Sequence, residues 1–185
     1  MANFTKLAIK ATFTKLIEEK PLSQITVKDI VTECGINRNS FYYHFQDVPA
    51  LIEEIIKEEA DHCIELFPNI DSIEDVLEVS LTFAIEKKKA VLHIFNSVSR
   101  DIFERHLMEL CEYSVTKYIN TVIGDRKVKE EAKDLLIQLV KCMCFGIVIE
   151  WLSDGMKDDL REPFHRLCEL NKGHIEEVII KNLYE

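Results

Sequence analysis

The segment that decides the fold is TVKDIVTECGINRNSFYYHF, which runs from Thr26 to Phe45. Thr26 is followed three residues later by the acid Asp29, which is the pattern of a capping box at a helix start. Gly35 lies where a helix commonly ends in the left-handed conformation, and Asn37 is a favourable N-cap for another short helix. The segment therefore predicts two short helices joined by a tight turn that contains glycine, which is a helix-turn-helix.

Helices on both sides should brace this pair. Lys20-Pro21 ends the preceding helix, because proline cannot continue it. Asp47 is positioned to cap a following helix, in whose first turn Pro49 is tolerated. The preceding helix has one apolar face, formed by Ile9, Phe13, Leu16 and Ile17.

In a helix-turn-helix the second helix enters the major groove of DNA. Arginine and asparagine can form two-pronged hydrogen bonds with guanine and adenine edges, and hydroxyl groups suit phosphates. The alternative is that the outward residues of the second helix are simply the polar face of an ordinary surface helix. DNA binding is favoured because cap, turn and groove-compatible residues occur in register. The outward residues of the second helix are expected to be Arg38, Asn39, Ser40, Tyr42, Tyr43 and His44.

These residues resemble the TetR/AcrR family of transcriptional regulators. The resemblance covers about the first 55 residues and is most specific in the Phe-Tyr-Tyr-His-Phe ending at Phe45. It implies that Thr26 and Lys28 contact the DNA backbone. It also implies the roles of the second helix, whose first residues read or line the groove and whose last ones grip phosphates or base edges. The predicted DNA-binding set is Thr26, Lys28, Asn37, Arg38, Asn39, Ser40, Tyr42, Tyr43 and His44.

One position departs from the family pattern. The fourth helix of the family usually opens with a lysine that contacts phosphate, whereas this chain has Val48 followed by Pro49. That phosphate contact is therefore missing, or the amide groups of the helix replace it.

The whole chain is predicted to be all-α, with about nine helices in 185 residues. Gly and Pro are scarce (5 and 4), and few segments have the pattern of strands bounded by tight turns. We expect a three-helix DNA-binding domain over residues 1–47 and a helical regulatory and dimerisation domain over residues 48–185. A helix from about Val48 to Phe67 should stop at Pro68, and a capping box at Ser72–Asp75 should open the next one.

Two long segments near the C-terminus are expected to form a homodimer interface. The resemblance implies that residues 128–152 and 163–183 pair with their copies in a second subunit. Residues 128–152 are apolar around most of a helix, and one chain offers few partners to cover them. A dimer implies a palindromic operator, with recognition helices about 34–36 Å apart or a multiple of that distance.

The resemblance also implies a small-molecule pocket among the middle helices. A bound effector would act by favouring a spacing of the two reading heads that DNA cannot accept. The ordinary alternatives to a ligand-binding role are that the tryptophan Trp151 is a core residue and that the histidine His93 is hydrogen-bonded to the backbone. The candidate pocket residues are His93, Asn96 and Ser97, with His62 and Trp151 as walls.

Charge and composition limit the other functional classes. The net charge of −10 is unusual for a nucleic-acid binder, but residues 1–50 hold six basic and five acidic side chains, so the acidity lies elsewhere. We find no secretory signal, and no stretch approaches the roughly 18–20 apolar residues that cross a bilayer, which predicts a cytoplasmic protein without a membrane partner. Glycine-rich phosphate loops and nucleophile elbows are also missing, so no enzyme, catalytic residue or cofactor is expected.

The six cysteines form no C-x-x-C pair. Cys142 and Cys144 are two residues apart on a predicted helix and cannot chelate one metal ion together. We therefore expect reduced structural thiols and no metal site, with a redox sensor as the less favoured interpretation.

Three functional hypotheses follow. The first is a ligand-responsive repressor that binds a palindromic operator as a dimer. The second is an activator or co-regulator whose C-terminal domain binds a protein partner. The third is a helical protein–protein module or redox sensor that has lost DNA binding, for which Val48 and the small positive balance of residues 1–50 are the support.

Overall fold

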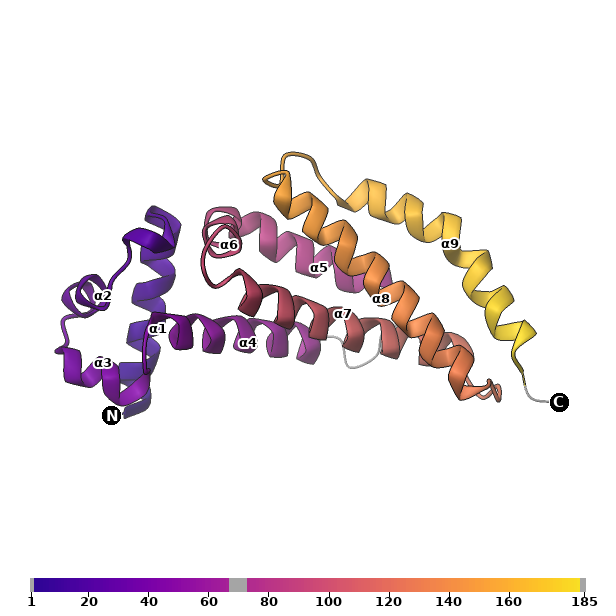
Figure 1. The fold of residues 1–185 in the computed structure, drawn as a ribbon, viewed down its shortest axis with the longest axis horizontal. Coiled ribbons are helices and arrows are strands. Elements are labelled where there is room, and N and C mark those ends of the chain that lie inside the picture. Colours follow the sequence, from indigo (N-terminus) through magenta and orange to yellow (C-terminus); the bar gives the residue numbers. More distant parts are fainter. Residues whose placement is uncertain (1, 67–72, 184–185) are drawn as a thin grey trace. The chain divides into compact units, whose positions relative to one another are not determined.

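The computed structural model describes the backbone of residues 2–66 and 73–183, with side chains except at 2–3, 66, 73–77, 79 and 171–172. Regular structure in these ranges is helical apart from an isolated β-bridge between Val128 and Leu183, which confirms the predicted all-α class. The described elements in chain order (Figure 1) are α1 (Ala2–Glu19), a 3-10 turn (Leu22–Gln24), α2 (Val27–Cys34), α3 (Arg38–His44), α4 (Val48–Leu66), α5 (Ile73–Glu86), α6 (Lys88–Phe95), α7 (Arg100–Ile123), α8 (Glu130–Ser153) and α9 (Arg161–Lys181).

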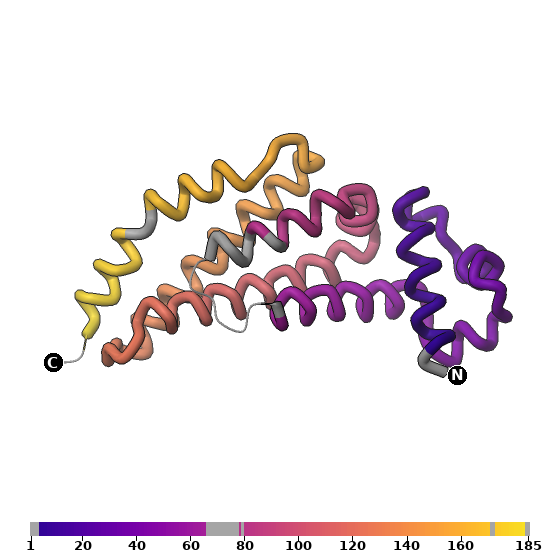
Figure 2. The backbone as a smooth tube through the Cα atoms, turned by 180° about the vertical axis from the view of Figure 1, so that it is seen from behind, coloured from indigo at the N-terminus to yellow at the C-terminus, as the bar shows by residue number. Residues whose placement is uncertain are grey.

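The chain divides into two compact units, of which the first contains Met1–Glu59 and Glu86–His106. Here α1 packs against α2, α3 and α6. α6 lies beside α1 although it comes much later in the chain, as the view from behind also shows (Figure 2). Phe13, Phe41 and Leu51 are among its fully buried side chains. This unit includes α6 and the first part of α4 in addition to α1–α3. The predicted functional division between residues 1–47 and 48–185 stays a prediction.

The second unit contains Ala60–Ile85 and Leu107–Glu185. Its core lies between α7, α8 and α9 and includes Ile119, Val140, Phe164 and Ile179. The N–H of Lys129 donates to the carbonyl oxygen of Asn182 (3.0 Å), so the start of α8 is joined to the end of α9. α8 and α9 therefore run side by side, as both ribbon and tube show (Figures 1 and 2).

α8 corrects one expectation from the sequence. In the described part of the chain it is the one helix that is long and apolar enough to cross a membrane, judged by length and composition alone. The sequence-based expectation missed it because isolated polar residues such as Gln138 and Lys141 interrupt the apolar run. Core helices of soluble proteins pass the same test, so the property is weak evidence for a membrane span. Only 28 % of the apolar window is fully buried, however, and Leu135 and Leu139 within it are exposed in the single chain.

Most helix ends lie within two residues of the predicted positions. α9 begins at Arg161 rather than Pro163, and α8 spans Glu130–Ser153 rather than residues 128–152. The predicted stop at Pro68 and the cap at Ser72 lie outside the described residues.

Candidate nucleic-acid interface

The start of α2 is set by a reciprocal pair of side-chain bonds. The Asp29 N–H donates to Oγ1 of Thr26 (3.3 Å), and the Thr26 N–H donates to Oδ2 of Asp29 (2.8 Å). The hydroxyl of Thr26 donates to the same carboxylate oxygen at 2.6 Å. These hydrogen bonds, from the Thr26 side chain first, hold the pKa of Asp29 below its ordinary value. The predicted capping box is therefore confirmed.

The turn between α2 and α3 depends on one left-handed residue. Gly35 has φ 72° and ψ 27°, and the N–H of Ile36 donates to the carbonyl oxygen of Val31 (3.0 Å). A Cβ built on Gly35 would meet nothing within 4 Å, so glycine is favoured by the backbone conformation and not by a lack of space. Asn37 then caps α3, because its Oδ1 accepts from the N–H of Ser40 at 2.9 Å.

α3 buries one face and exposes the other. Phe41 is fully buried, and its neighbours Tyr42 and Tyr43 are 55 % and 77 % exposed. Arg38 and Asn39 are exposed as well, at the N-terminal end of the helix. Ser40 and His44 are half-buried. The exposed face of α3 thus carries hydrogen-bonding groups that suit base edges and phosphates.

Some of the predicted DNA-binding side chains already have local partners. The hydroxyl groups of Thr26 and Ser40 donate to Asp29 and Asn37, respectively. Oδ1 of Asn37 accepts two bonds from Ser40, which leaves its amide N–H groups as donors. Thr26 and Ser40 can donate from the hydroxyl to a phosphate only if that proton leaves its present acceptor, whereas the hydroxyl oxygen can still accept from a base amino group.

Most basic side chains in the first fifty residues are neutralised by tertiary contacts. Four of the six lie within ion-pair distance of a carboxylate, which was not visible from the sequence because the partners are far apart in the chain. The pairs are Lys6 with Glu54 (2.7 Å), Lys10 with Glu54 and with Glu58 (2.5 Å for the latter), Lys15 with Glu33 (2.6 Å) and Lys20 with Asp29 (3.7 Å).

The two remaining cations of this segment are Lys28 and Arg38. Both are exposed, and neither has a carboxylate within ion-pair distance in the described part of the chain. Lys28 is on α2 and Arg38 opens α3. The positive charge left over for an anionic partner is therefore concentrated on the helix-turn-helix.

The start of α4 offers little to a phosphate. Oδ1 of Asp47 accepts from the N–H of Ala50 at 2.8 Å, as expected for its cap, and Pro49 has no N–H. The N–H of Leu51 donates to the carbonyl oxygen of Asp47 at 3.3 Å. Only the amide of Val48 is left at this end, so the helix cannot supply several amides in place of the missing lysine.

Three of the predicted pocket residues lie in the first unit, at or after α6. Nδ1 of His93 is 2.7 Å from the carbonyl oxygen of Ile17. The amide of Asn96 donates to the carbonyl oxygen of Leu92, and the hydroxyl of Ser97 donates to that of Ile94. These bonds agree with the alternative to a ligand-binding role, in which the side chains are hydrogen-bonded to the backbone.

The other two predicted pocket residues belong to the second unit. His62 is exposed, whereas Trp151 is buried and donates from Nε1 to the carbonyl oxygen of Asp158 at 2.6 Å. The ligand-binding role of all five residues stays a prediction. A cavity of about 410 Å³ between the end of α7 and the start of α8 is lined by other residues, among them Asn120, Lys127 and Lys133.

The cysteines are free thiols in different environments. Cys142 is exposed and Cys144 is buried, as their spacing on α8 requires. Burial raises the pKa of Cys144 and of Cys111 to about 12, so both are protonated at neutral pH and poor nucleophiles. Cys144 is therefore unsuited to sense oxidants. Among the described residues, no group of His, Cys, Asp and Glu could hold a metal ion.

Two family models match the chain. The model described as "Bacterial regulatory proteins, tetR family" matches residues 10–55, which include the whole helix-turn-helix. The model described as "Transcriptional regulator C-terminal region" matches residues 71–173, which is more than half of the chain.

A curated relative is similar in the N-terminal region alone. The HTH-type transcriptional regulator EthR of Mycobacterium tuberculosis is 40 % identical over 47 residues. The match covers 25 % of this chain and 22 % of EthR, so it spans less than a quarter of that relative's length.

Solved structures share the fold over nearly the whole length. The dihydroxyacetone kinase operon activator DhaS superposes with a TM-score of 0.75 at 20 % identity, covering 97 % of this chain and 98 % of that one. A TetR transcriptional regulator from Rhodococcus sp. RHA1 gives 0.57 at 14 % identity (92 % and 97 % covered). NalD, the secondary repressor of the MexAB-OprM multidrug efflux pump in Pseudomonas aeruginosa, gives 0.53 at 18 % identity (100 % and 99 % covered). At these identities the likeness shows a common fold.

Proposed function

Because this chain belongs to the TetR family of DNA-binding transcriptional regulators, which are not enzymes, we propose that it binds a palindromic operator as a cytoplasmic homodimer and represses transcription until a small-molecule effector releases it. The helix-turn-helix of α2 and α3 is its DNA-binding element. The dimer would form through residues 128–152 and 163–183, as expected from the sequence.

The observation that carries the proposal is the charge left on the helix-turn-helix. Lys28 and Arg38 are exposed and without carboxylate partners among the described residues, whereas the other four basic side chains of the segment are paired. Binding to DNA is driven largely by neutralising phosphates. An anion that approaches this segment therefore meets its strongest attraction at α2 and α3.

The proposed division of labour follows the geometry of α3. Arg38 and Asn39 face outward at the end that meets base edges in this motif, and would read them through two-pronged bonds. Tyr42 and Tyr43 would grip phosphates from the exposed middle of the helix, with His44 beside them. Lys28 on α2 would contact the backbone and position the reading helix without selecting sequence. Thr26, Asn37 and Ser40 would contribute mainly by holding the two helix starts.

An effector would lower operator affinity only as far as it prefers the conformation that cannot bind DNA. His62, His93, Asn96, Ser97 and Trp151 remain our candidates to meet it. Replacing the exposed His62 or Asn96 should then change the effector concentration that releases DNA and leave operator affinity without effector unchanged.

Activation is the second candidate function. DhaS, whose structure covers nearly all of this chain, is described as an operon activator, whereas NalD is described as a repressor. Expression from the operator promoter in cells with and without this gene separates the two possibilities. A rise on deletion supports repression, and a fall supports activation by a protein or small-molecule partner.

The direct test is a DNA-binding titration at two salt concentrations, with the region upstream of the gene and with sites selected from random DNA. We expect a discrete complex that survives competitor DNA and weakens linearly in log salt. Lys28→Ala should reduce the salt slope by about one if Lys28 contacts one phosphate. Lys15→Ala is the matched control, because Lys15 is also exposed but is paired with Glu33. Failure of both the upstream region and the selection would exclude DNA binding and favour the protein-partner hypothesis.

A further inference from the structure

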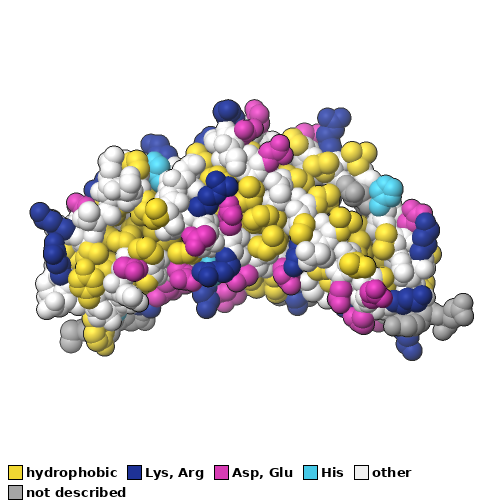
Figure 3. All heavy atoms as spheres, in the orientation of Figure 1, with side chains coloured by type: hydrophobic (Ala, Val, Ile, Leu, Met, Phe, Trp, Pro, Cys, Tyr) yellow, Lys and Arg dark blue, Asp and Glu magenta, His cyan; other side chains and the backbone are white. Residues whose placement is uncertain are grey.

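The outer face of α8 is an uncovered apolar stripe. Leu135 and Leu139 are 64 % and 67 % exposed, and Cys142 and Gly146 are exposed as well. These four residues recur at spacings of three and four, which places them on one side of a helix with about 3.6 residues per turn. The opposite side holds the buried Val140 and Cys144 (among others) against the core of the unit. Figure 3 shows hydrophobic side chains gathered over the region where Figure 1 draws α8 and α9.

The C-terminal half of this stripe is made of small side chains. Cys142 and Gly146 lie one turn apart, with the large Leu135 and Leu139 on the N-terminal side. A Cβ added to Gly146 would meet nothing within 4 Å in the single chain, so no intrachain contact requires glycine there. Glycine in a helix interior costs about 1 kcal/mol relative to alanine. A second helix that approaches closely at this point would offset that cost.

The stripe suits a second copy of itself. At a two-fold axis each residue meets its own copy, so like charges or bulky side chains there would repel or clash. None of Leu135, Leu139, Cys142 and Gly146 is charged, although the chain carries a net charge of −10. The charge of the neighbouring Lys141 is neutralised by Glu112 at 2.8 Å. The exposed Glu131 and Glu150 lie on the same side of the helix, one turn beyond Leu135 and Gly146, so the neutral line where two copies can meet is limited to residues 135–146.

We propose that the two subunits of the dimer cross at Cys142 and Gly146 of α8, with the two-fold axis between the two Cys142 side chains. This inference rests on the proposed homodimer and specifies the place of closest approach within it. Packed helix axes are about 8–10 Å apart, and small side chains at the contact favour the lower end. With Cα atoms about 2.3 Å from each axis, facing Cα atoms would then be within disulfide range.

α9 is a poorer place for the axis. Its exposed side includes Leu170 and Gly173, but Arg166 and Glu177 are only 11 residues apart around them, whereas Glu131 and Glu150 on α8 are 19 residues apart. Charged side chains next to their own copies across an axis would repel, so we expect α9 to pack at the sides of the interface. Leu170 would then contribute apolar area away from the axis.

Disulfide trapping tests the crossing point. Diamide takes two electrons and two protons from a pair of thiols and leaves a disulfide, which forms only between Cα atoms closer than about 7 Å. We expect the unmodified protein to give a covalent dimer on a non-reducing gel. Cys63→Ser should still give it, and Cys142→Ser should not. Sedimentation under reducing conditions, run in parallel, should show a dimer for all three.

A glycine substitution provides a second, independent test. Gly146→Leu adds a good helix former where the single chain has room, so the fold should persist while the dimer dissociation constant rises at least tenfold. Gly173→Leu is the matched substitution on α9, and should change that constant much less.

The outcomes separate this inference from the proposed function. A dimer that gives no cross-link, or a cross-link that survives Cys142→Ser, overturns the crossing point and leaves the homodimer intact. A larger increase of the dimer dissociation constant for Gly173→Leu than for Gly146→Leu would move the axis to α9. It would also overturn the crossing point and leave the homodimer intact. A monomer in sedimentation would overturn both the crossing point and the proposed dimer.

Discussion

Lys28 and Arg38 matter because other basic residues near them are already paired. A surface ion pair contributes little to stability, but it uses a charge that would otherwise attract phosphate. Lys15 is similarly exposed and pairs with Glu33 at 2.6 Å. Exposure alone therefore does not identify the cations that meet DNA.

Arg38→Ala is expected to reduce discrimination between the operator and altered sites. The loss should be about 1–3 kcal/mol if the guanidinium binds a guanine edge in two-pronged fashion. Fluorescence anisotropy with the selected operator and single-base variants measures it, with Lys15→Ala as the control. Unchanged discrimination by Arg38→Ala would place sequence reading elsewhere on the protein.

The helices of the DNA-binding unit are delimited by short-range hydrogen bonds. Thr26 and Asp29 close the start of α2, Asn37 closes the start of α3, and Asp47 closes the start of α4. Each bond spans three residues and fixes the chain direction at the helix start without a long-range contact. The direction of the reading helix thus depends on caps formed within the chain itself.

Thr26→Ala should destabilise the protein by about 1 kcal/mol, because it removes an acceptor for the first turn of α2. Urea unfolding followed by circular dichroism measures the change in the free energy of unfolding. Thr32→Ala is the matched control, since Thr32 is exposed on the same helix and is not a cap. Equal effects of the two substitutions would mean that the capping box contributes nothing measurable.

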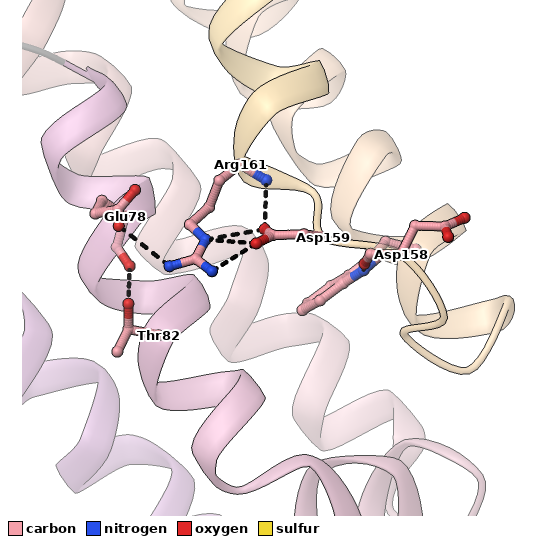
Figure 4. A network of polar contacts seen from close by, with 6 residues as sticks. Glu78, Thr82, Asp158, Asp159 and Arg161 are labelled. Carbon is pink, nitrogen blue, oxygen red and sulfur yellow. Dashed lines mark hydrogen bonds and ion pairs between the residues drawn. The ribbon is translucent and has the colours of Figure 1, made fainter.

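The segment just before α9 contains a carboxylate whose contacts depend on pH (Figure 4). Asp159 accepts from the backbone N–H of Arg161 at 3.0 Å and from its guanidinium, which also lies 3.4 Å from Glu78 on α5. Hydrogen bonds from the Arg161 side chain lower the pKa of Asp159 from 3.8 to about 2. Because the pKa falls on folding, the stability that this carboxylate contributes is present above its ordinary pKa and is lost as pH falls towards 2.

Asp159→Asn should therefore flatten the fall of the unfolding temperature between pH 4 and pH 2. Calorimetry across this range measures it. Asp158→Asn is the matched control, because Asp158 is adjacent and contributes its backbone carbonyl, rather than its carboxylate, to the bond with Trp151. A steeper profile for Asp159→Asn than for the unmodified protein would contradict the assignment.

At the scale of the whole molecule, one helix-turn-helix is a small reading device. α3 spans only Arg38–His44, and within the described residues Lys28 and Arg38 are the cations of the first fifty positions that have no carboxylate partner. A homodimer doubles the number of reading helices and the number of unpaired cations, and it matches the two-fold symmetry of a palindrome. In the proposed dimer, the apolar face of α8 is the surface that would favour association.

An operator with altered half-site spacing tests this arrangement. Inserting about five base pairs turns one half-site by half a helical turn, away from the second recognition helix. We expect binding to fall to the level of a single half-site, and restoring the helical phase to recover part of it. Footprinting and anisotropy on the same fragments measure both. Indifference to the insertion would mean that the subunits read DNA independently.

The sequence by itself determined the parts of this protein that depend on neighbours in the chain. The caps at Thr26, Asn37 and Asp47 and the left-handed Gly35 were predicted because each acts over three or four residues, within reach of pattern reasoning. The all-α class and the outward face of α3 follow from the same local periodicity.

Only the tertiary structure decided which groups are free. Lys10 is neutralised by Glu58, which is 48 residues away, and His93 bonds to the carbonyl oxygen of Ile17 across 76 residues. The apolar pattern of α8 likewise did not tell how much of the helix one chain would cover; the fold leaves Leu135 and Leu139 in solvent. The reason is physical: capping energies are set within one helical turn, whereas charge pairing and burial depend on residues that are brought together only when the chain folds.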